Sequence, residues 1–417
     1  MLIAVSGDRP APRNLFVESG AMLGLLGLGV LAMQLVISGR HRWFAGRLGQ
    51  DNLLQFHRQV GIFGWLLVLS HPLCMIIGSP VYLAFLDPRA GWIRAFTLYL
   101  LLLAATTLIV TTLWRRRFHL QYEWWRAVHA VLALVVVAGG LGHALMADHY
   151  TAGWVTKALL GGVVVVPLLL LLETRLFRPW RLRRRPWRVQ LVEQRSGGVT
   201  RLELRPEGHP GMQFNPGQFA WLTLGPSPYT LQQHPFSIAS AATEPERIEL
   251  AIKPLGDFSA SVADVACGTH AWLEGPYGTF SFDVTSGRRA VFVAGGTGIT
   301  PMISMLRTCR AKGCPQPLWL VDANNEQGDI IFRNEIESLA QTLALRVVHV
   351  LLEPPPGWQG ETGFVDEALL DRVLPPDAAD IDYFVCGPPP MMNLVEPALR
   401  ARGVTADRLH SERFELV

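Results

Sequence analysis

Long apolar runs with few charged residues dominate the first 180 residues of the chain. Five of these runs are long enough to cross a membrane, because a helix needs about 20 predominantly apolar residues to span ~30 Å of hydrocarbon. They cover about residues 20–38, 55–78, 92–114, 124–147 and 153–176. The pattern therefore predicts an all-α bundle of about five transmembrane helices over residues 1–180.

The pattern changes at Trp187, where short alternating strands separated by Gly/Pro turns begin. The segments WRVQLVEQR, VTRLELRP, QFAWLTL, RIELAIK and HAWLEGP are of this kind, and their spacing predicts a small antiparallel β-barrel over residues 181–287. From Arg288 onward, buried strands alternate with helical segments. That alternation predicts a doubly wound α/β domain with a parallel sheet over residues 288–417.

Basic residues are distributed unevenly around the apolar runs. They cluster at 40–47, 115–117 and 175–188, whereas the alternate loops are poor in Lys and Arg. The positive-inside rule places these clusters in the cytoplasm, with the N-terminus outside and the C-terminal domains inside the cell. We therefore expect a multi-pass protein of the inner (plasma) membrane. The cluster 175–188 suits either anionic lipid headgroups or the solvated end of the last helix.

Composition narrows the functional classes. Hydrophobic residues make up 50% of the chain and charged residues 17%, which fits a membrane protein, and the net charge of +3 does not indicate a nucleic-acid partner. The five cysteines include no C-x-x-C pair, so neither a disulfide framework nor a zinc site is indicated. Residues 1–19 lack the residue order of a signal peptide, and we expect no cleaved leader there.

Two of the apolar runs carry a duplicated pair of histidines. His57 and His71 are fourteen residues apart in the second run, and His129 and His143 repeat this spacing in the fourth. Fourteen residues are close to four helical turns, so both members of a pair project from one helix face, about 21 Å apart along the axis. Because the second and fourth spans run in the same direction, His57 should lie level with His129 near the inner face. His71 should then lie level with His143 near the outer face.

Ionisable groups inside a membrane are costly, and their presence points to a functional site. Two stacked bis-imidazole sites suit two b-type haems, with the four histidines as metal ligands. Other interpretations remain open: each histidine hydrogen-bonds a neighbouring carbonyl, or the histidines line a metal path in a transporter whose soluble half is a sensor. A b-type absorption spectrum would distinguish these hypotheses.

Three motifs in the second half are typical of nucleotide chemistry. AVFVAGGTGITP places Gly295, Gly296 and Gly298 between a strand and a helix, where backbone amides can approach a pyrophosphate, although an ordinary tight turn is the alternative. In KPLGDFSASV a short helix opened by a serine is a second phosphate-binding candidate. Cys386 ends a strand at the edge where open α/β sheets bind ligands, or it is a packing residue.

The acidic residue Asp322 is expected at the end of the strand PLWLVDA, followed by Asn324 and Asn325, with no cationic side chain before Arg333. A carboxylate near the ribose favours a free 2′-hydroxyl, whereas a 2′-phosphate needs a cation. This pattern favours NADH over NADPH and leaves both open.

The order of the motifs PGQF, HPFS, GDFS, GPYG, GGTGITP and CGPPPMM, followed by the C-terminal Phe414, resembles the ferredoxin–NADP⁺ reductase family. Joined to helices with duplicated histidine pairs, the chain resembles the ferric reductase / NADPH oxidase superfamily in a bacterial form. The resemblance covers nearly all of residues 50–417. Similar family members have six spans where we count five, and the missing one would be the first.

The resemblance implies FAD bound in the barrel domain. His234 would contact the phosphate–ribityl region, Phe236 would pack on the isoalloxazine, and Ser237 would hydrogen-bond near its reactive nitrogen. Gly256 and Ser259 would meet the pyrophosphate. The expected FAD-binding residues are His234, Pro235, Phe236, Ser237, Gly256, Phe258 and Ser259.

The resemblance also implies NADH or NADPH in the last domain. Cys386 and Gly387 would line the hydride-transfer face, and Phe414 would cover the flavin ring until nicotinamide displaces it, so that Cys386, Phe414 and Ser237 are the expected catalytic residues. Three residues follow Phe414, unlike in the shortest family members. The expected nucleotide-binding residues are Gly295, Gly296, Thr297, Gly298, Thr300, Pro301, Asp322, Cys386, Gly387 and Pro388.

The function implied is transmembrane electron transfer from cytoplasmic NAD(P)H through FAD and two haem b groups to an extracytoplasmic acceptor. Three acceptors remain open: O₂ giving superoxide, a ferric chelate, or a periplasmic redox partner that this chain serves as an electron-donor subunit. On the outer side, His149 and Arg89 are candidates for steering O₂ or an anionic chelate.

Overall fold

The computed structural model describes residues 13–41, 50–147, 149–376 and 380–413. The chain forms two compact units, and the main division falls between Arg178 and Pro179. The first unit is helical, and the second contains both sheets. Each unit is described by itself below.

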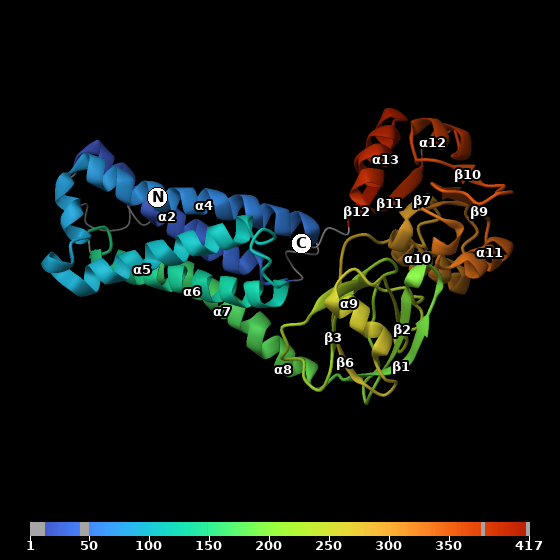
Figure 1. Ribbon diagram of the computed structural model, residues 1–417, viewed down its shortest axis with the longest axis horizontal. Coiled ribbons are helices and arrows are strands. Elements are labelled where there is room, and N and C mark those ends of the chain that lie inside the picture. Colours follow the sequence, from blue (N-terminus) through green and yellow to red (C-terminus); the bar gives the residue numbers. More distant parts are fainter. Residues whose placement is uncertain (1–12, 42–49, 148, 377–379, 414–417) are drawn as a thin grey trace. The chain divides into compact units, whose positions relative to one another are not determined.

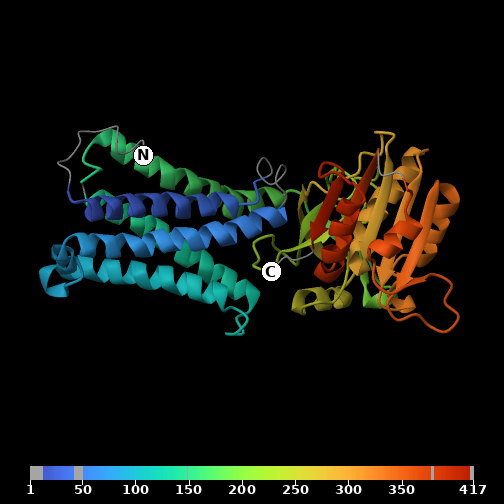
Figure 2. The same ribbon diagram turned by 90° about the horizontal axis from the view of Figure 1, so that it is seen from above.

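The first unit is a bundle of long apolar helices. They are α2 (Leu15–Ile37), α4 (Gln50–Gly78), α5 (Pro88–Leu113), α6 (Tyr122–Ala147) and α7 (Trp154–Leu172), with the short helix η1 (Pro80–Phe85) between α4 and α5. After α7 the chain continues through the π-helix η2 (Glu173–Phe177) into α8 (Arg178–Leu182). Within the described residues, five helices are long and apolar enough to cross a membrane, as the hydrophobic pattern predicts. Figures 1 and 2 show these helices running side by side.

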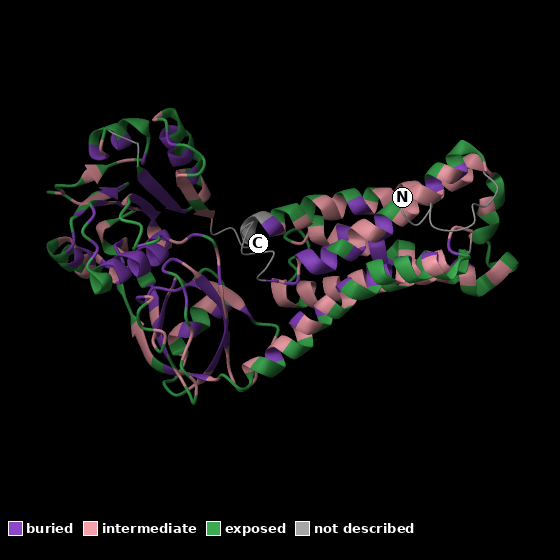
Figure 3. Cartoon of the chain, turned by 180° about the vertical axis from the view of Figure 1, so that it is seen from behind, coloured by how far each residue is buried: buried purple, intermediate pink, exposed green. Residues whose placement is uncertain are grey.

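The bundle places small residues where helices approach and leaves large apolar side chains on its outside. Ala104 and Ala105 of α5 pack against Val136 of α6, while Leu103 and Val131 remain 64% and 60% exposed. Figure 3 shows that the helices of the first unit expose many residues, whereas the strands of the second unit are mostly buried. Small residues at contacts and apolar side chains facing outward are typical of a bundle that lies in lipid.

The second unit begins with an antiparallel barrel. Its strands are β1 (Trp187–Gln194), β2 (Thr200–Pro206), β3 (Phe219–Leu224), β4 (His234–Ser237), β5 (Ile248–Ile252) and β6 (His270–Tyr277), in the order β4-β3-β6-β1-β2-β5. An isolated bridge between Ile238 and Leu250 joins the two edge strands and closes the sheet. The core consists of side chains pointing inward from alternate positions, among them Leu202, Leu204 and Leu222.

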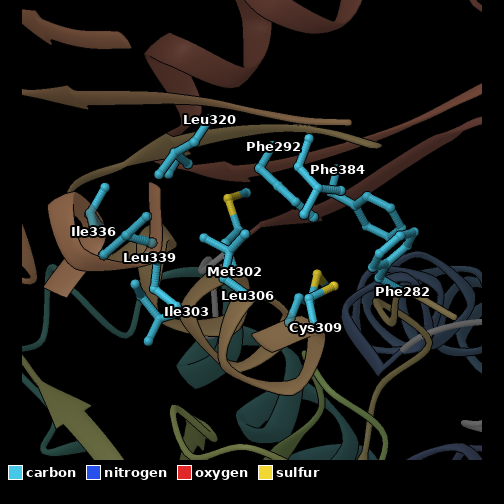
Figure 4. Close-up of a cluster of buried hydrophobic side chains, with 14 of the residues drawn as sticks. Phe282, Phe292, Met302, Ile303, Leu306, Cys309, Leu320, Ile336, Leu339 and Phe384 are labelled. Carbon is cyan, nitrogen blue, oxygen red and sulfur yellow. The ribbon is translucent and has the colours of Figure 1, made fainter. Parts of the chain in front are cut away.

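A parallel sheet follows. Its strands are β7 (Arg289–Gly295), β8 (Leu318–Asn324), β9 (Leu345–Leu351), β10 (Glu361–Thr362), β11 (Ile381–Gly387) and β12 (Leu409–Arg413), in the order β10-β9-β8-β7-β11-β12. Helices α10 (Ile299–Lys312) and α11 (Arg333–Thr342) pack on one face, where Phe292, Met302 and Leu320 meet (Figure 4). Helices α12 (Glu367–Val373) and α13 (Pro389–Ala401) cover the other face. This is the doubly wound arrangement that the alternating pattern predicts.

Helix α10 connects the barrel to the parallel sheet through polar contacts. The hydroxyl of Ser304 donates to the carbonyl of Ser240 (2.7 Å), and the hydroxyl of Thr308 accepts from the backbone N–H of Ala242 (2.9 Å). Between them, Arg307 forms two hydrogen bonds to Glu335 of α11 (2.6 and 2.7 Å). Positions 304, 307 and 308 lie on one face of a helix, so a single stripe of α10 faces the barrel.

Arg307 also reaches Glu249 of β5, whose side chain is fully buried. The Glu249 carboxylate accepts from Arg307 (3.0 Å), Arg201 (2.9 Å) and Arg247 (3.2 Å). Burial by itself raises the pKa of Glu249, but the nearby charges of Arg307 and Arg201 outweigh it and hold the pKa below its ordinary value. A buried carboxylate is tolerated here because three guanidinium groups compensate its lost hydration.

We expect Arg307→Leu to destabilise the second unit by about 3 kcal/mol, because removing one partner leaves Glu249 and Glu335 undercompensated. For a unit of this size, the unfolding midpoint should fall by about 6–12 °C. A thiol-reactive fluorophore on the full chain in detergent measures this, since Cys309, Cys314 and Cys386 are buried until the unit unfolds. Arg333→Leu, which removes an exposed pair with Glu337, is the control and should change the midpoint little. Equal midpoints for the two variants would contradict the prediction.

Candidate functional site

The structure brings the four histidines of the apolar runs together as two pairs across α4 and α6. The ring centroids of His57 and His129 are 6.2 Å apart with an interplanar angle of 57°. Those of His71 and His143 are also 6.2 Å apart, with an angle of 67°. The spacing along each helix and the common direction of the two helices therefore generate two cross-helix pairs at two levels.

This separation matches two imidazoles that share one metal. If each ligating nitrogen lies about 2 Å from the metal, the two ring centroids are roughly 6 Å apart. Two histidines commonly hold the iron of a b-type haem. The imidazole donors and the separation of their ring centroids thus fit one haem iron that each pair would hold.

One histidine of each pair is oriented by a neighbouring helix. Nδ1 of His71 lies 2.8 Å from the carbonyl oxygen of Gly20 in α2, and because a carbonyl only accepts, Nδ1 carries the proton. The hydroxyl of Thr112 in α5 donates to the carbonyl of Leu108 (2.7 Å), so it accepts from Nδ1 of His129 (3.2 Å). In both rings the lone pair is left on Nε2, which is the usual arrangement for a metal-bound histidine.

Sequence reasoning missed the part that α2 plays. The first apolar run contains no histidine, and we assigned the ligand site to the second and fourth runs alone. The only sequence signal for a close approach is the series of glycines at 20, 24 and 27, which recur on one face of α2.

In the barrel, the motifs HPFS and GDFS meet although they are distant in sequence. The ring of Phe258 lies 4.2 Å from the ring of His234 and 6.3 Å from that of Phe236, with interplanar angles of 21° and 19°. Ser237, the last residue of β4, is 6% exposed, and its hydroxyl has no hydrogen-bond partner among the described residues. Such a buried hydroxyl is costly unless a ligand completes its bonding.

The GDFS segment corrects one expectation. We expected a serine to open the short helix, but α9 (Asp257–Ser261) begins after Gly256, and Ser259 is its third residue. The Ser259 hydroxyl accepts from the backbone N–H groups of Leu255 and Gly256, at 2.9 Å each. The serine therefore satisfies these amides itself, and the Gly256 amide is not free to bind a phosphate.

The glycines of GGTG serve two purposes. A Cβ on Gly298 would clash with the carbonyl of Cys386, and one on Gly295 would lie 2.8 Å from Pro388 Cδ. These glycines let the turns after β7 and β11 interlock. Gly296 differs, because it has φ of +54° and a Cβ there would meet open space. It is the position of this turn where a ligand can approach the backbone.

Two more side chains near these turns are buried. Thr300, at the start of α10, is 2% exposed, and its hydroxyl has no partner within the described parts of the chain. Cys386 is fully buried beneath the GGTG turn, on the sheet face that α10 covers. Thr297 and Pro301 lie in the same turn and helix start. Phe414 lies outside the described residues.

Asp322 is placed differently from our expectation. Strand β8 continues to Asn324, so Asp322 lies within the strand rather than at its end. Its carboxylate is 2% exposed and accepts a hydrogen bond from Nδ1 of His349 in β9 (3.1 Å). A ribose contact therefore does not fit Asp322. At the strand end, Asn324 is 9% exposed, and its amide nitrogen has no partner among the described residues.

Three family models match successive parts of the chain. A model of the ferric reductase-like transmembrane component matches residues 23–140, which include all four histidines. A model of an FAD-binding domain matches residues 188–281, and one of an oxidoreductase NAD-binding domain matches residues 292–396.

Similar curated proteins align with part of the chain. NADH-cytochrome b5 reductase 1 of Pyricularia oryzae is 35% identical over 170 residues, which cover 39% of this chain and 55% of that protein. The reductase component of propane 2-monooxygenase of Rhodococcus jostii is 28% identical over 236 residues, covering 54% of this chain and 62% of that protein. The chain thus spans little more than half of the length of these relatives.

A solved structure supports the fold of the second unit. The flavohem-like FAD/NAD-binding domain of nitric oxide dioxygenase from Vibrio cholerae aligns with a TM-score of 0.50 and 25% identity, covering 55% of this chain and 98% of that one. The chain thus combines a ferric reductase-like transmembrane component with FAD-binding and NAD-binding domains, the domain organisation of a ferric reductase / NADPH oxidase-like protein with a ferredoxin-reductase-like half.

Proposed function

We propose that this chain is an oxidoreductase that carries electrons from NAD(P)H, bound by its second unit, across a membrane to an acceptor on the opposite face. FAD would supply the conversion from two-electron to one-electron transfer, and two b-type haems would supply one-electron stations within the membrane. The observation that carries the proposal is the pair of 6.2 Å histidine contacts in a chain that also matches FAD- and NAD-binding families.

The membrane unit holds ligands in place and excludes water. His57 and His129 would ligate one iron, and His71 and His143 the other. Thr112 and Gly20 orient one imidazole at each level. The ring centroid of Trp125 lies 5.2 Å from that of His129, and apolar side chains such as Leu31 pack in the core of the bundle. Apolar surroundings keep solvent away from the irons and help to set their potentials.

In the second unit, Phe236 and the buried hydroxyl of Ser237 are suited to the flavin ring, and the backbone at Gly296 with the Thr300 hydroxyl is suited to the dinucleotide. We propose Cys386 as a residue that shapes the floor of the nicotinamide site, because it is buried under the GGTG turn. Phe414 remains proposed as the aromatic that covers the flavin.

We propose NADH as the preferred donor. The buried amide of Asn324 at the end of β8 can hydrogen-bond a free 2′-hydroxyl, and it offers no charge to bind a 2′-phosphate. The similar cytochrome b5 reductase of Pyricularia oryzae is named for its use of NADH. The carboxylate of Asp322, which suggested the same preference from sequence, is engaged by His349 and does not contribute.

We propose O₂, giving superoxide, as the acceptor, with a ferric chelate and a periplasmic redox partner as alternatives. Arg13 is paired with Glu18 (3.0 Å) near the start of α2. Burial and the charge of Arg13 lower the pKa of His149, which makes its imidazole harder to protonate. Arg13 is paired with Glu18, so these two side chains favour a neutral acceptor, whereas the exposed Arg89 favours an anionic chelate. Arg89 remains a candidate for steering O₂ or an anionic chelate toward the outer histidine pair.

Location in the plasma membrane with a cytoplasmic second unit is part of the same proposal. It is supported by the five apolar helices and by the basic clusters between α2 and α4, after α5 and after α7.

His57→Leu and His71→Leu should each remove one of two haem equivalents, because one axial ligand of a bis-histidine site is lost. Reduced-minus-oxidised spectra of purified protein, with haem measured per chain, test this. His119→Asn, in the loop after α5, is the control and should keep both haems; asparagine tolerates the positive φ found there. Full haem in both leucine variants would refute the ligand assignment, and a colourless wild type would favour the transport hypothesis.

Ser237→Ala should weaken FAD binding by roughly tenfold without destabilising the FAD-free protein, because its hydroxyl has no partner to lose among the described residues. Ser240→Ala is the matched control, since the buried Ser240 hydroxyl accepts from the Glu249 amide (3.2 Å). That variant should lower stability and leave FAD affinity unchanged. Titration of FAD fluorescence and thermal unfolding measure the two effects. If Ser237→Ala lowered stability and left FAD affinity unchanged, Ser237 would not be part of the flavin site.

Steady-state turnover of FAD-loaded wild type, with NADH or NADPH and with O₂ or ferric citrate, tests donor and acceptor together. We expect a higher kcat/KM with NADH than with NADPH. We also expect superoxide to form from O₂ whether or not ferric citrate is present. Faster turnover with NADPH at equal micromolar concentrations would overturn the donor preference. Ferric reduction that persists without oxygen and exceeds superoxide formation would favour the chelate. Weak activity with both acceptors would favour a partner protein.

A further inference from the structure

Helix α2 packs on α4 through a face of glycines that includes the contact to His71. A Cβ on Gly27 would lie 2.9 Å from Val68 Cγ2, and one on Gly20 would lie 3.0 Å from Met75 Cγ. Between these two positions, a Cβ on Gly24 would lie 2.9 Å from Nδ1 and 3.1 Å from Cγ of His71. The imidazole of His71 therefore rests directly on the α2 backbone at Gly24.

The same close approach allows the hydrogen bond to Gly20. A side chain at position 24 would separate the helices and move the ring away from the Gly20 carbonyl, which lies 2.8 Å from Nδ1. Glycine at 24 thus provides the space, and the carbonyl of Gly20 provides the acceptor. Helices in membranes approach this closely only where small residues line the contact.

The contact is confined to one histidine pair. Further along α2, the small residue is on the other helix, because a Cβ on Gly64 of α4 would meet Val30 and Leu31 at 3.0 Å. At the other level, Nδ1 of His57 has no hydrogen-bond partner among the described residues, and the oriented ring is His129, held by Thr112 of α5. Helix α2 therefore orients His71, and α5 orients His129.

We propose that Gly24 and Gly20 of α2 are positioning residues for the His71/His143 site: Gly24 supports the imidazole plane, and the Gly20 carbonyl fixes the Nδ1 proton so that Nε2 faces His143. This inference rests on the proposed function, because it assumes an iron between the two rings. A hydrogen bond from Nδ1 makes the ring a more basic ligand, and losing such a bond typically weakens metal binding by about 10–100-fold.

Gly24→Ala and Gly27→Ala form a matched pair. Both add one methyl group to the same helix at a contact of 2.9 Å, but only the methyl group at 24 meets a histidine. Alanine favours the helix more than glycine does, so the substitution itself does not unwind α2. Full-length protein is purified from haem-replete cells, and three properties are measured: haem per chain, the reduction midpoints of the two sites, and the low-temperature EPR signals of the ferric sites.

For Gly24→Ala we expect the His71/His143 site either to lose its haem or to show a changed EPR signal and reduction midpoint. The His57/His129 site is the internal control. Gly27→Ala should keep both sites unchanged. Gly20→Ala, which presses on Met75 and on the backbone of His71, should alter the same site as Gly24→Ala. Thr112→Val should alter the opposite site, because it removes the acceptor for His129.

Two unchanged sites in Gly24→Ala would overturn the inference. So would equal damage to both sites in Gly24→Ala, or equal effects of Gly24→Ala and Gly27→Ala, since the cause would then be general packing of α2. A wild-type protein without haem would instead refute the proposed function, so the two failures can be told apart.

Discussion

An imidazole inside an apolar bundle needs a partner for each of its nitrogens, and this requirement organises the membrane unit. Water is absent from a hydrocarbon layer, so an unsatisfied ring nitrogen there is costly. The rings lie in two pairs with 6.2 Å between centroids, a separation that would suit one metal shared by each pair. On the other nitrogen, His71 and His129 use acceptors from helices that carry no histidine. The proposed site therefore involves four helices, although α4 and α6 supply all four histidines.

Close backbone approach at glycine recurs in both units. In the bundle, Gly24 lets α2 lie against an imidazole, and in the α/β domain, Gly298 lets the turn after β7 lie on the carbonyl of Cys386. In each case the missing side chain brings a helix or a helix start next to a position where a cofactor would bind. Gly296 is different, because it faces open space and has positive φ. The same residue type thus builds the scaffold at some positions and exposes the backbone at others.

The two units also differ in how their buried polar and charged side chains are paired. Among the described residues of the bundle, the buried imidazoles of His71 and His129 are paired with a backbone carbonyl and a threonine hydroxyl. The second unit buries a full charge at Glu249 and surrounds it with arginines from β2, the turn before β5, and α10. Because Arg307 and its neighbours on α10 face the barrel, the helix that starts at the GGTG turn is also the one that fixes the barrel to the parallel sheet. The cofactor domains are thereby held in one unit.

The sequence determined the five spans, the barrel, the parallel sheet and the pairing of histidines by level, because apolar length, strand alternation and helical periodicity are local properties. It did not predict β10, which is only two residues long, or the polar edge strand β12. Tertiary structure decided which groups the chain satisfies by itself: His349 engages Asp322, and Ser259 bonds its own turn, while the buried hydroxyls of Ser237 and Thr300 have no partner among the described residues. It also decided that α2 reaches His71. Periodicity within one helix fixes which side chains share a face, but the neighbour that meets that face depends on the packing of the whole bundle.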